Sequence, residues 1–308
     1  MIKSKSFLVA SPLRAAGQAG GAGHGGKHPR GLRAGLSMGE LIVGMVILAI
    51  IGMALSRILV SQARYFSHQK TANLARNVSR GPLNRVVSDL RMVEALGGVV
   101  SASDTALLVR VPYAIGVVCS STGGATHISL LPVDSAMYAS AGFSGYAWRG
   151  GSGVYRYVET GGSAVFDGDL AVCNTALIST LTADQAKVIK IIPALTDTAS
   201  FGTPVFLYRH IKYEFKPSVA VSGTRGLFRT VMATGASEEL AAPFDNASKF
   251  RFFVLNSLTS QAAPPADLST LRGIELLMNG MSERVPNGSV ARASAPFTTA
   301  VYFKNRLD

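Results

Sequence analysis

Apolar positions along the chain follow three successive patterns, and each pattern predicts a different element. Residues 36–55 form a continuous apolar run of 20 residues in which Glu40 is the only charged residue. As a helix, such a run is about 30 Å long, enough to cross the hydrocarbon core of a membrane. From residue 57 to 96 apolar residues recur at helical spacing, so we predict an amphipathic continuation of this helix. Its apolar stripe comprises Leu83, Val86, Val87, Leu90, Val93 and Leu96.

Two pairs of residues are predicted to limit this helix. Gly81-Pro82 should kink or break it, because proline lacks the backbone donor and clashes with the preceding turn. Gly97-Gly98 should end it. The charged residues of the segment are expected elsewhere around the helix, away from the apolar stripe; they are Arg85, Asp89, Arg91 and Glu94.

Beyond residue 100 the period becomes alternating, which predicts short strands between Gly- and Ser-rich stretches. The longest is expected at residues 205–215, where Val205, Leu207, Ile211, Tyr213 and Phe215 share one parity. We interpret these runs as the core of a sheet, which predicts an α+β fold: a long N-terminal helix packed on an antiparallel, β-rich C-terminal head. The other predicted strands are 105–111, 126–131, 153–159, 188–192, 227–233, 249–256, 272–278 and 298–304.

The positive charge of the chain is unevenly distributed. The net charge is +12, and half of it lies in the first 35 residues, which contain no acidic residue. This segment is rich in Gly, Ala and Ser and lacks a core-forming period, so we expect it to be disordered. If it is removed as a leader, the argument from charge to nucleic-acid binding is weakened.

Three interpretations of the apolar run compete. A cleaved secretory signal would need a shorter run and a small-residue exit site, for which residues 60–63 (VSQA) are a poor match. An ordinary signal anchor explains the span but leaves Glu40 without a role. A carboxylate within a membrane helix is costly and usually has a partner. The third interpretation therefore has to supply a partner for Glu40.

The arrangement of a basic leader ending at Gly35, an apolar run, and Glu40 five residues after the glycine resembles the prepilin cleavage site of type IV pilins and type II secretion pseudopilins. The resemblance implies cleavage after Gly35 and N-methylation of the new terminus, Leu36. It further implies that Glu40 pairs with the terminal amine of a neighbouring subunit and sets the axial register of assembly. Two positions depart from the family pattern, since Leu36 replaces the usual Phe and Gly39 replaces a large apolar residue.

Later segments add a weaker resemblance to the large PilW-like minor pilins and J-type pseudopilins. It rests on a Tyr-rich strand, an LxR strand, an aromatic strand, a penultimate strand and a closing V-x-x-K-N sequence. In this sequence these are residues 208–215, 226–229, 250–255, 273–278 and 299–306. Residues 100–200 match nothing in that family.

The resemblance implies a domain organisation and a location. Residues 1–35 would be a cytoplasmic leader that is removed, 36–60 a transmembrane and filament-core helix, 61–98 its amphipathic continuation, and 99–308 a periplasmic head. The protein would be a single-pass inner-membrane protein before it enters a pilus or pseudopilus. The counts of basic residues at the two ends of the apolar run do not decide its orientation, so the cleavage motif does.

The function implied is that of a non-enzymatic minor pilin or pseudopilin that initiates or caps a filament. The implied partners are other minor pilins or pseudopilins, the major pilin, the prepilin peptidase, an inner-membrane platform protein and membrane lipid; no cofactor is expected. Two rivals are a DNA-uptake pilin with a nucleic-acid-binding head and, less favoured, a signal-anchored periplasmic enzyme. A DNA-binding head would show affinity that falls with salt, whereas an enzyme would keep its N-terminus and tolerate loss of Glu40.

The two cysteines, Cys119 and Cys173, both follow the apolar run. In an oxidising compartment such a pair forms a disulfide, and the alternative is two buried free thiols. The sequence has no CxxC and no His/Cys cluster, so neither redox catalysis nor structural zinc is indicated.

Other candidate chemistry is weak. The sequence contains no GxSxG and no P-loop, and the five scattered histidines lack partners at metal-ligand spacing. Asp167-Gly168-Asp169 is interpreted as a turn, with a calcium loop as the alternative. Trp148 and Tyr146 are expected to anchor a packed loop. Basic residues beside aromatic ones are interpreted as a solvated sheet face, with a DNA-binding surface as the alternative; they are Arg209, Lys212, Lys216, Lys249 and Arg251.

Overall fold

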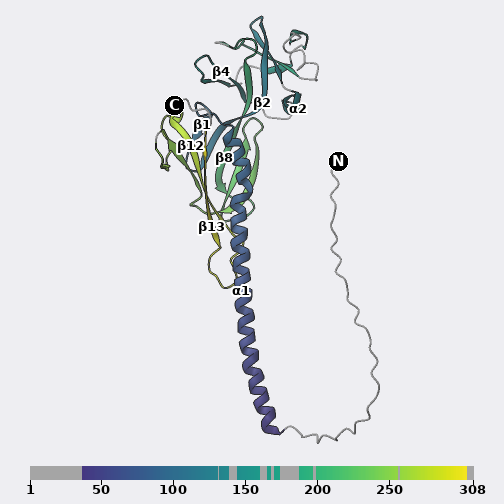
Figure 1. The fold of residues 1–308 in the computed structure, drawn as a ribbon, viewed down its shortest axis with the longest axis vertical. Coiled ribbons are helices and arrows are strands. Elements are labelled where there is room, and N and C mark those ends of the chain that lie inside the picture. The colour runs from purple at the N-terminus through teal and green to yellow at the C-terminus, as the bar shows by residue number, and fades with distance from the viewer. Residues whose placement is uncertain are drawn as a thin grey trace, which may run out of the picture. The chain divides into compact units, whose positions relative to one another are not determined.

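The structure, a computed structural model, confirms the α+β class: a long apolar N-terminal helix precedes a large antiparallel sheet (Figure 1). It describes residues 37–130, 132–138, 144–159, 165–167, 170–173, 187–196, 199–255 and 257–303. The chain divides into two units, Met1–Arg57 and Ile58–Asp308, which are treated separately below.

The first element, α1, spans Met38–Arg91 and passes through Gly81-Pro82 without interruption, so the predicted break there is wrong. Pro82 is buried, and its neighbours on the same face pack against the sheet, so tertiary contacts hold the helix on both sides of the missing hydrogen bond. The predicted end at Gly97-Gly98 is also wrong. The helix ends at Arg91. Val93 is buried, as the apolar stripe predicts, but it belongs to the turn that follows the helix.

Thirteen strands of the described residues form one sheet in which every pairing is antiparallel. Their order is β11-β12-β10-β9-β8-β2-β3-β7-β6, with β1 on β2, β13 on β12, and β4 on both β8 and β5. The bounds are β1 Val99–Ala102, β2 Ala106–Thr122, β3 Ala125–Leu130, β4 Gly145–Arg149, β5 Tyr155–Glu159, β6 Val165–Asp167, β7 Val188–Ile191, β8 Pro204–Pro217, β9 Arg225–Val231, β10 Ala236–Phe244, β11 Lys249–Val254, β12 Leu271–Met281 and β13 Ser294–Tyr302. Short helices are α2 (Pro132–Tyr138), η1 (Leu170–Cys173) and η2 (Leu268–Thr270).

Each predicted strand overlaps an observed one, but β1, β4, β6 and β10 are not among the predicted strands, and β2 is longer than predicted. β2 continues past Val111 because the register shifts between Pro112 and Ala114, and such an irregularity tolerates proline within a strand. β10 has weak strand character in its sequence and forms by pairing with β9. β4 contains Tyr146 and Trp148, so the prediction of a loop at these residues is wrong, although both are buried as expected. β1 and β6 are short and carry little pattern.

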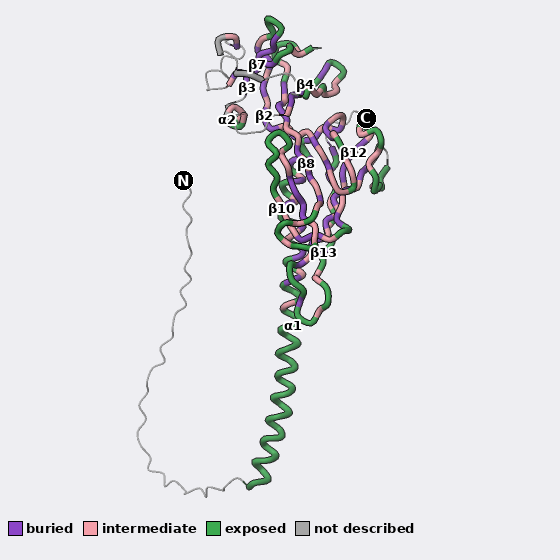
Figure 2. Tube along the Cα trace, turned by 180° about the vertical axis from the view of Figure 1, so that it is seen from behind, coloured by how far each residue is buried: buried purple, intermediate pink, exposed green. Residues whose placement is uncertain are grey.

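The C-terminal part of α1 packs on the sheet through a core of aliphatic and aromatic side chains. Figure 2 shows buried positions along the trace of the head. At the centre of this contact the Ser79 hydroxyl lies 3.3 Å from the Met278 carbonyl oxygen, to which it donates, and accepts from the Gly280 N–H at 3.1 Å. A Cβ added at Gly280 would lie 2.3 Å from the Ala75 carbonyl oxygen. Glycine at position 280 therefore allows the helix backbone to approach β12 directly.

We expect Gly280→Ala to lower the free energy of unfolding by about 1–3 kcal/mol, because the new methyl group overpacks a contact with backbone that cannot rotate away. Gly81→Ala is the matched control. A Cβ at Gly81 meets nothing within 4 Å, so this change should raise stability by about 0.5–1 kcal/mol through helix propensity. Chemical denaturation of the two variants tests both signs. Equal effects would mean that the Gly280 contact is not tight.

Candidate functional site

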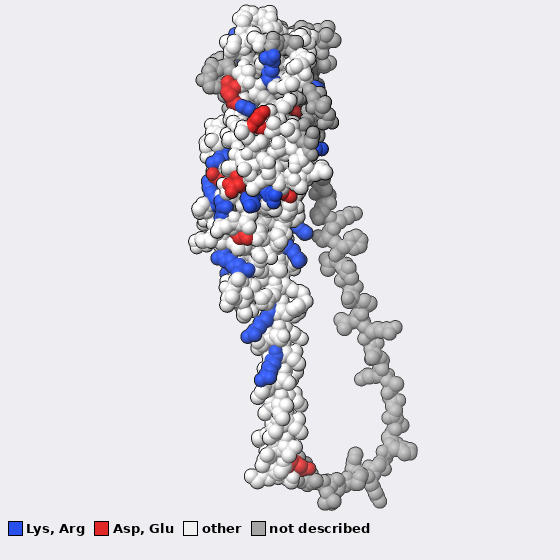
Figure 3. All heavy atoms as spheres, turned by 90° about the vertical axis from the view of Figure 1, so that its left-hand side faces the viewer, with Lys and Arg blue, Asp and Glu red and all other residues white. Residues whose placement is uncertain are grey.

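The N-terminal part of α1 is apolar around its whole circumference, and every residue from 37 to 66 is exposed (Figure 2). In Figure 3 this part is almost free of charged side chains. A helix that is apolar all round is stable in water only when something else covers it. Exposed fractions of 48–83% occur at Met38, Leu41, Ile42, Val43, Met45, Val46, Ile47, Leu48, Ile50, Ile51, Met53, Leu55, Ile58, Leu59 and Val60.

Among the described residues, α1 is the one helix long and apolar enough to cross a membrane, judged by length and composition. Cβ atoms added at Gly44 and Gly52 would meet nothing within 4 Å, so no contact inside the chain requires glycine there. Small residues on such a helix permit close approach of a second helix. The surface of residues 38–60, which we call the apolar segment, therefore has the properties of a helix that is covered by lipid or by other helices.

Glu40 has a local partner that the sequence interpretation overlooked. Its carboxylate accepts a hydrogen bond from the Ser37 N–H (3.0 Å), and the Ser37 hydroxyl accepts one from the Glu40 N–H (3.2 Å). This reciprocal pair is a capping box, and the S-x-x-E pattern ahead of an apolar run could have predicted it. Gly35 and Leu36 lie outside the described residues, so cleavage after Gly35 and pairing of Glu40 with a Leu36 amine stay predictions.

A buried ionic cluster fixes the C-terminal part of α1 to the sheet. The Asp89 Oδ2 atom accepts hydrogen bonds from the Tyr213 hydroxyl (2.6 Å) and from Arg229 Nε (3.1 Å). Asp89 is 4% exposed, Arg229 5% and Tyr213 0%. Arg85 lies 3.8 Å from the same carboxylate, and Glu238 lies 3.6 Å from Arg229 at the outer edge. We call Asp89, Tyr213 and Arg229 the Asp89 cluster.

The prediction that Asp89 lies away from the apolar stripe is wrong. Asp89 follows Val86 by three residues and precedes Val93 by four, so its position is on the buried face. An acid on an apolar face needs a partner, and the partner of Asp89 is 140 residues away in sequence. The sequence did single out Arg229 as part of an LxR strand, without assigning it a contact.

The pKa shifts in the cluster agree with this geometry. Burial, and then the Asp89 carboxylate, raise the pKa of Tyr213, so this residue stays protonated and remains a donor. For Arg229 burial acts to lower the pKa, but Tyr213 and Asp89 outweigh it and the net pKa is raised. The cluster is therefore an ion pair with a neutral phenol, and its role is to hold helix and sheet in one register.

Cys119 and Cys173 are joined in a disulfide, with Cα atoms 5.2 Å apart and a sequence separation of 54. Both are buried and pack with Val188, away from the core beneath α1. The bridge ties the short η1 helix to β2. The alternative of two free thiols is thus not what the structure contains.

We expect the double substitution Cys119→Ser/Cys173→Ser to lower the free energy of unfolding by about 2–4 kcal/mol, because it releases a long loop in the unfolded chain. Denaturation of the variant and of the parent protein, with and without reductant, measures the effect. Reductant should destabilise the parent and leave the variant unchanged. A parent protein that is insensitive to complete reduction would contradict the prediction.

The basic residues weighed as a DNA-binding surface are mostly partnered. Lys212 lies 2.8 Å from Glu214, Arg251 lies 3.6 Å from Glu275, and Lys216 lies over the Phe228 ring at 4.2 Å. Arg209 lies over the Tyr113 ring at 5.4 Å. These contacts leave less free charge for phosphates than the sequence suggested.

The remaining candidates add no chemistry within the described residues. No group of three His, Cys, Asp or Glu side chains there could hold a metal ion. Asp167 ends β6, while Gly168 and Asp169 lie outside the description, so the calcium alternative is not addressed. His127 is buried, and His210 lies 3.2 Å from Glu159.

Comparison of the chain with protein-family models, curated proteins and solved structures found no match. Any functional assignment therefore depends on the N-terminal motif, the exposed apolar segment and the arrangement of the head.

Proposed function

We propose that this protein is a minor pilin or pseudopilin, a structural subunit that initiates or caps a type IV pilus or a type II secretion pseudopilus. The observation that carries the proposal is the combination of Gly35 and Glu40 with an apolar segment exposed on all sides. A carboxylate at the start of such a segment is costly in lipid unless a cation neutralises it. The terminal amine of a processed neighbouring subunit is such a cation.

Assembly then follows from ordinary physical chemistry. In the membrane, lipid covers the apolar segment; in a filament, the apolar segments of neighbouring subunits cover it. The charge of the Glu40 carboxylate favours the one axial offset at which it meets an amine, because both charges lose water and are stabilised only together. Small residues such as Gly44 and Gly52 favour close helix packing.

The head supports the proposal by its firm attachment to the helix. The Asp89 cluster and the Ser79–Gly280 contact hold the C-terminal part of α1 on the sheet. Proposed partners are other minor pilins or pseudopilins, the major pilin, the prepilin peptidase and a platform protein of the inner membrane. The proposed location is the inner membrane, with the head in the periplasm, and afterwards the filament.

The test of this proposal is the mature N-terminus, determined by mass spectrometry of protein extracted from membranes. We expect a chain that begins at N-methylated Leu36. Gly35→Leu should leave the precursor intact, whereas Gly39→Ala, the matched control, should be processed normally. An intact Met1 in the parent protein, or cleavage near Ala63, would overturn the proposal.

A further inference from the structure

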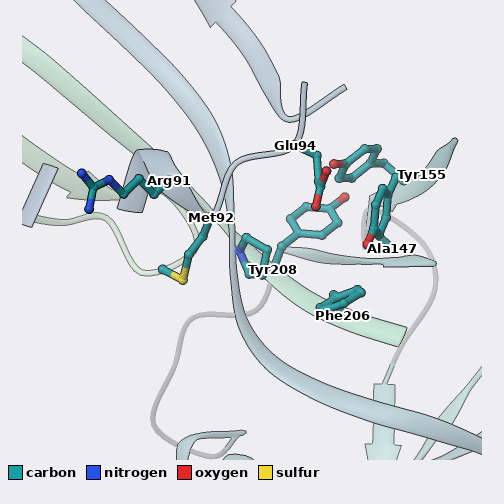
Figure 4. Close-up of a pocket in the computed structure, with 9 residues that line it drawn as sticks. Arg91, Met92, Glu94, Ala147, Tyr155, Phe206 and Tyr208 are labelled. Atoms are coloured by element: carbon teal, nitrogen blue, oxygen red, sulfur yellow. The ribbon is translucent and has the colours of Figure 1, made fainter. Parts of the chain in front are cut away.

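A pocket of about 230 Å³ lies in the head, beyond the C-terminal end of α1 (Figure 4). Its walls come from the end of α1, the segment that follows it, and the four strands β2, β4, β5 and β8. The segment after α1 supplies Met92 and Glu94, β5 supplies Tyr155 and Tyr157, and β8 supplies Phe206 and Tyr208. The lining is largely apolar and includes four aromatic rings, and neither the Asp89 cluster nor the apolar segment contributes to it.

The four rings form one connected cluster. Tyr155 packs edge-on against Phe206 with ring centres 5.8 Å apart, and Tyr157 packs edge-on against Tyr208 at 5.6 Å. Tyr155 and Tyr157 are 6.4 Å apart and join the two pairs. The four rings are therefore differently oriented around the same pocket, in the manner of an aromatic cage.

This cluster already holds one cation of the chain itself. The Arg110 guanidinium lies 4.8 Å from the centre of the Tyr157 ring and 5.7 Å from that of Tyr208. It is kept there by Glu159, which accepts from Arg110 Nε at 2.9 Å, and by the Gly97 carbonyl oxygen. Arg110 does not line the pocket. The electron-rich ring faces thus attract positive charge outside the pocket, and other parts of the same rings face into it.

Two charged residues line the pocket, Arg91 and Glu94, and their side chains point in different directions. Glu94 points toward the tyrosine rings, whereas the guanidinium of Arg91 points away from them (Figure 4). Burial, and then the Glu94 carboxylate, raise the pKa of Tyr155 and of Tyr157, so both phenols stay neutral. Of the two charged residues that line the pocket, the one directed toward the rings is therefore a carboxylate.

We propose that this pocket binds a small organic cation through a quaternary ammonium group. Aromatic rings with a carboxylate attract positive charge, and methyl groups on nitrogen pack on ring faces while they reduce the cost of losing water. A plain ammonium group is more strongly hydrated and fits a largely apolar lining less well. The inference concerns the head alone and does not depend on the proposed assembly function.

The pocket is fixed before any ligand arrives. Gly97 has a φ of +80°, and a Cβ at this position would lie 2.9 Å from the Tyr157 ring. The backbone of the turn after α1 therefore packs directly on the ring. The Tyr208 hydroxyl donates to the Val158 carbonyl oxygen at 3.0 Å, which fixes a second ring. Prior ordering of these walls reduces the entropy lost on binding.

The experiment is equilibrium dialysis of choline with the full-length protein, purified in a maltoside detergent that carries no choline headgroup. The control ligand is 3,3-dimethyl-1-butanol, the neutral isostere in which carbon replaces the charged nitrogen. We expect choline to bind about tenfold more tightly than the isostere, the size expected of a cation–π site that excludes water. A parallel titration with trimethyllysine compares the two sources of a quaternary ammonium group. Tighter binding of choline indicates a free small cation, and tighter binding of trimethyllysine indicates a methylated side chain.

Two variants test the residues. Glu94→Gln keeps the shape and removes the charge, and Tyr155→Leu removes a half-buried ring; each should weaken choline binding about tenfold or more. Tyr65→Leu, on an exposed part of α1, is the control and should leave it unchanged. Because a pocket variant could unfold, the Met92 methyl resonance of the parent protein is followed as well, and it should shift with choline. Equal affinity for choline and the isostere, or an unchanged Met92 resonance at saturating choline, would overturn the proposal.

Discussion

Replacement of Glu40 by Gln should abolish entry of the protein into filaments while leaving the folded chain in the membrane. Removing one partner of a buried ion pair costs about 3–5 kcal/mol, which corresponds to a loss of association of about 100-fold or more. Gln retains the size of the side chain and can still serve in a capping box. The measurement is the fraction of the protein in sheared filaments relative to the membrane fraction, in cells that also lack the parent protein.

The capping box provides the control for this experiment. Ser37→Ala removes the hydroxyl that accepts from the Glu40 N–H and keeps the charge of Glu40. If neutralisation of Glu40 drives assembly, Ser37→Ala should assemble nearly as the parent does, since a lost cap costs only about 1 kcal/mol. Failure of Ser37→Ala together with normal assembly of Glu40→Gln would show that Glu40 acts as a helix cap and not as a charge.

Replacement of Asp89 by Asn should lower the free energy of unfolding by about 3–5 kcal/mol, because Arg229 is then left as a buried charge without its carboxylate. Tyr213→Phe removes one hydrogen bond to the same carboxylate and should cost about 1.5–3 kcal/mol. Denaturation of the full-length protein in detergent, followed by the fluorescence of Trp148 in the head, measures both changes.

Two further variants distinguish the loss of the ion pair from a general perturbation of the helix as the cause of the lower stability. Arg85→Ala removes the exposed partner, 3.8 Å from Asp89, and should cost no more than about 1 kcal/mol. The double variant Asp89→Asn/Arg229→Met removes the acid and the base together and should be less destabilised than the sum of its single variants. Strict additivity, or an Arg85→Ala effect as large as that of Asp89→Asn, would contradict the role assigned to the cluster.

The most reliable predictions from sequence depended on local patterns. The apolar run at 36–55 and the alternation at 205–215 identified α1 and β8, because the spacing of apolar residues over consecutive positions indicates the type of element. The capping box of Ser37 and Glu40 is equally local, and its pattern was present in the sequence. These features require no knowledge of what lies across the fold.

The errors have a common physical origin. Pro82 lies within a continuous helix because packing against the sheet outweighs the loss of one hydrogen bond. β10, a weak strand former, is held by its pairing with β9. In each case a distant contact outweighed a local preference, and such contacts are not visible in a window of neighbouring residues.

Local patterns in the sequence are enough to identify the apolar helix, its single carboxylate, the change to alternating strands, and the α+β class. The end of α1, the burial of Asp89 with Arg229 and Tyr213, and the meeting of rings from β5 and β8 with Glu94 around one pocket depend on contacts across the fold. The physical reason is that hydrophobic periodicity reports the burial of each position, whereas an ion pair or an aromatic cage depends on which buried positions become neighbours. That choice is made by the pairing of strands and the docking of the helix, over separations of more than a hundred residues.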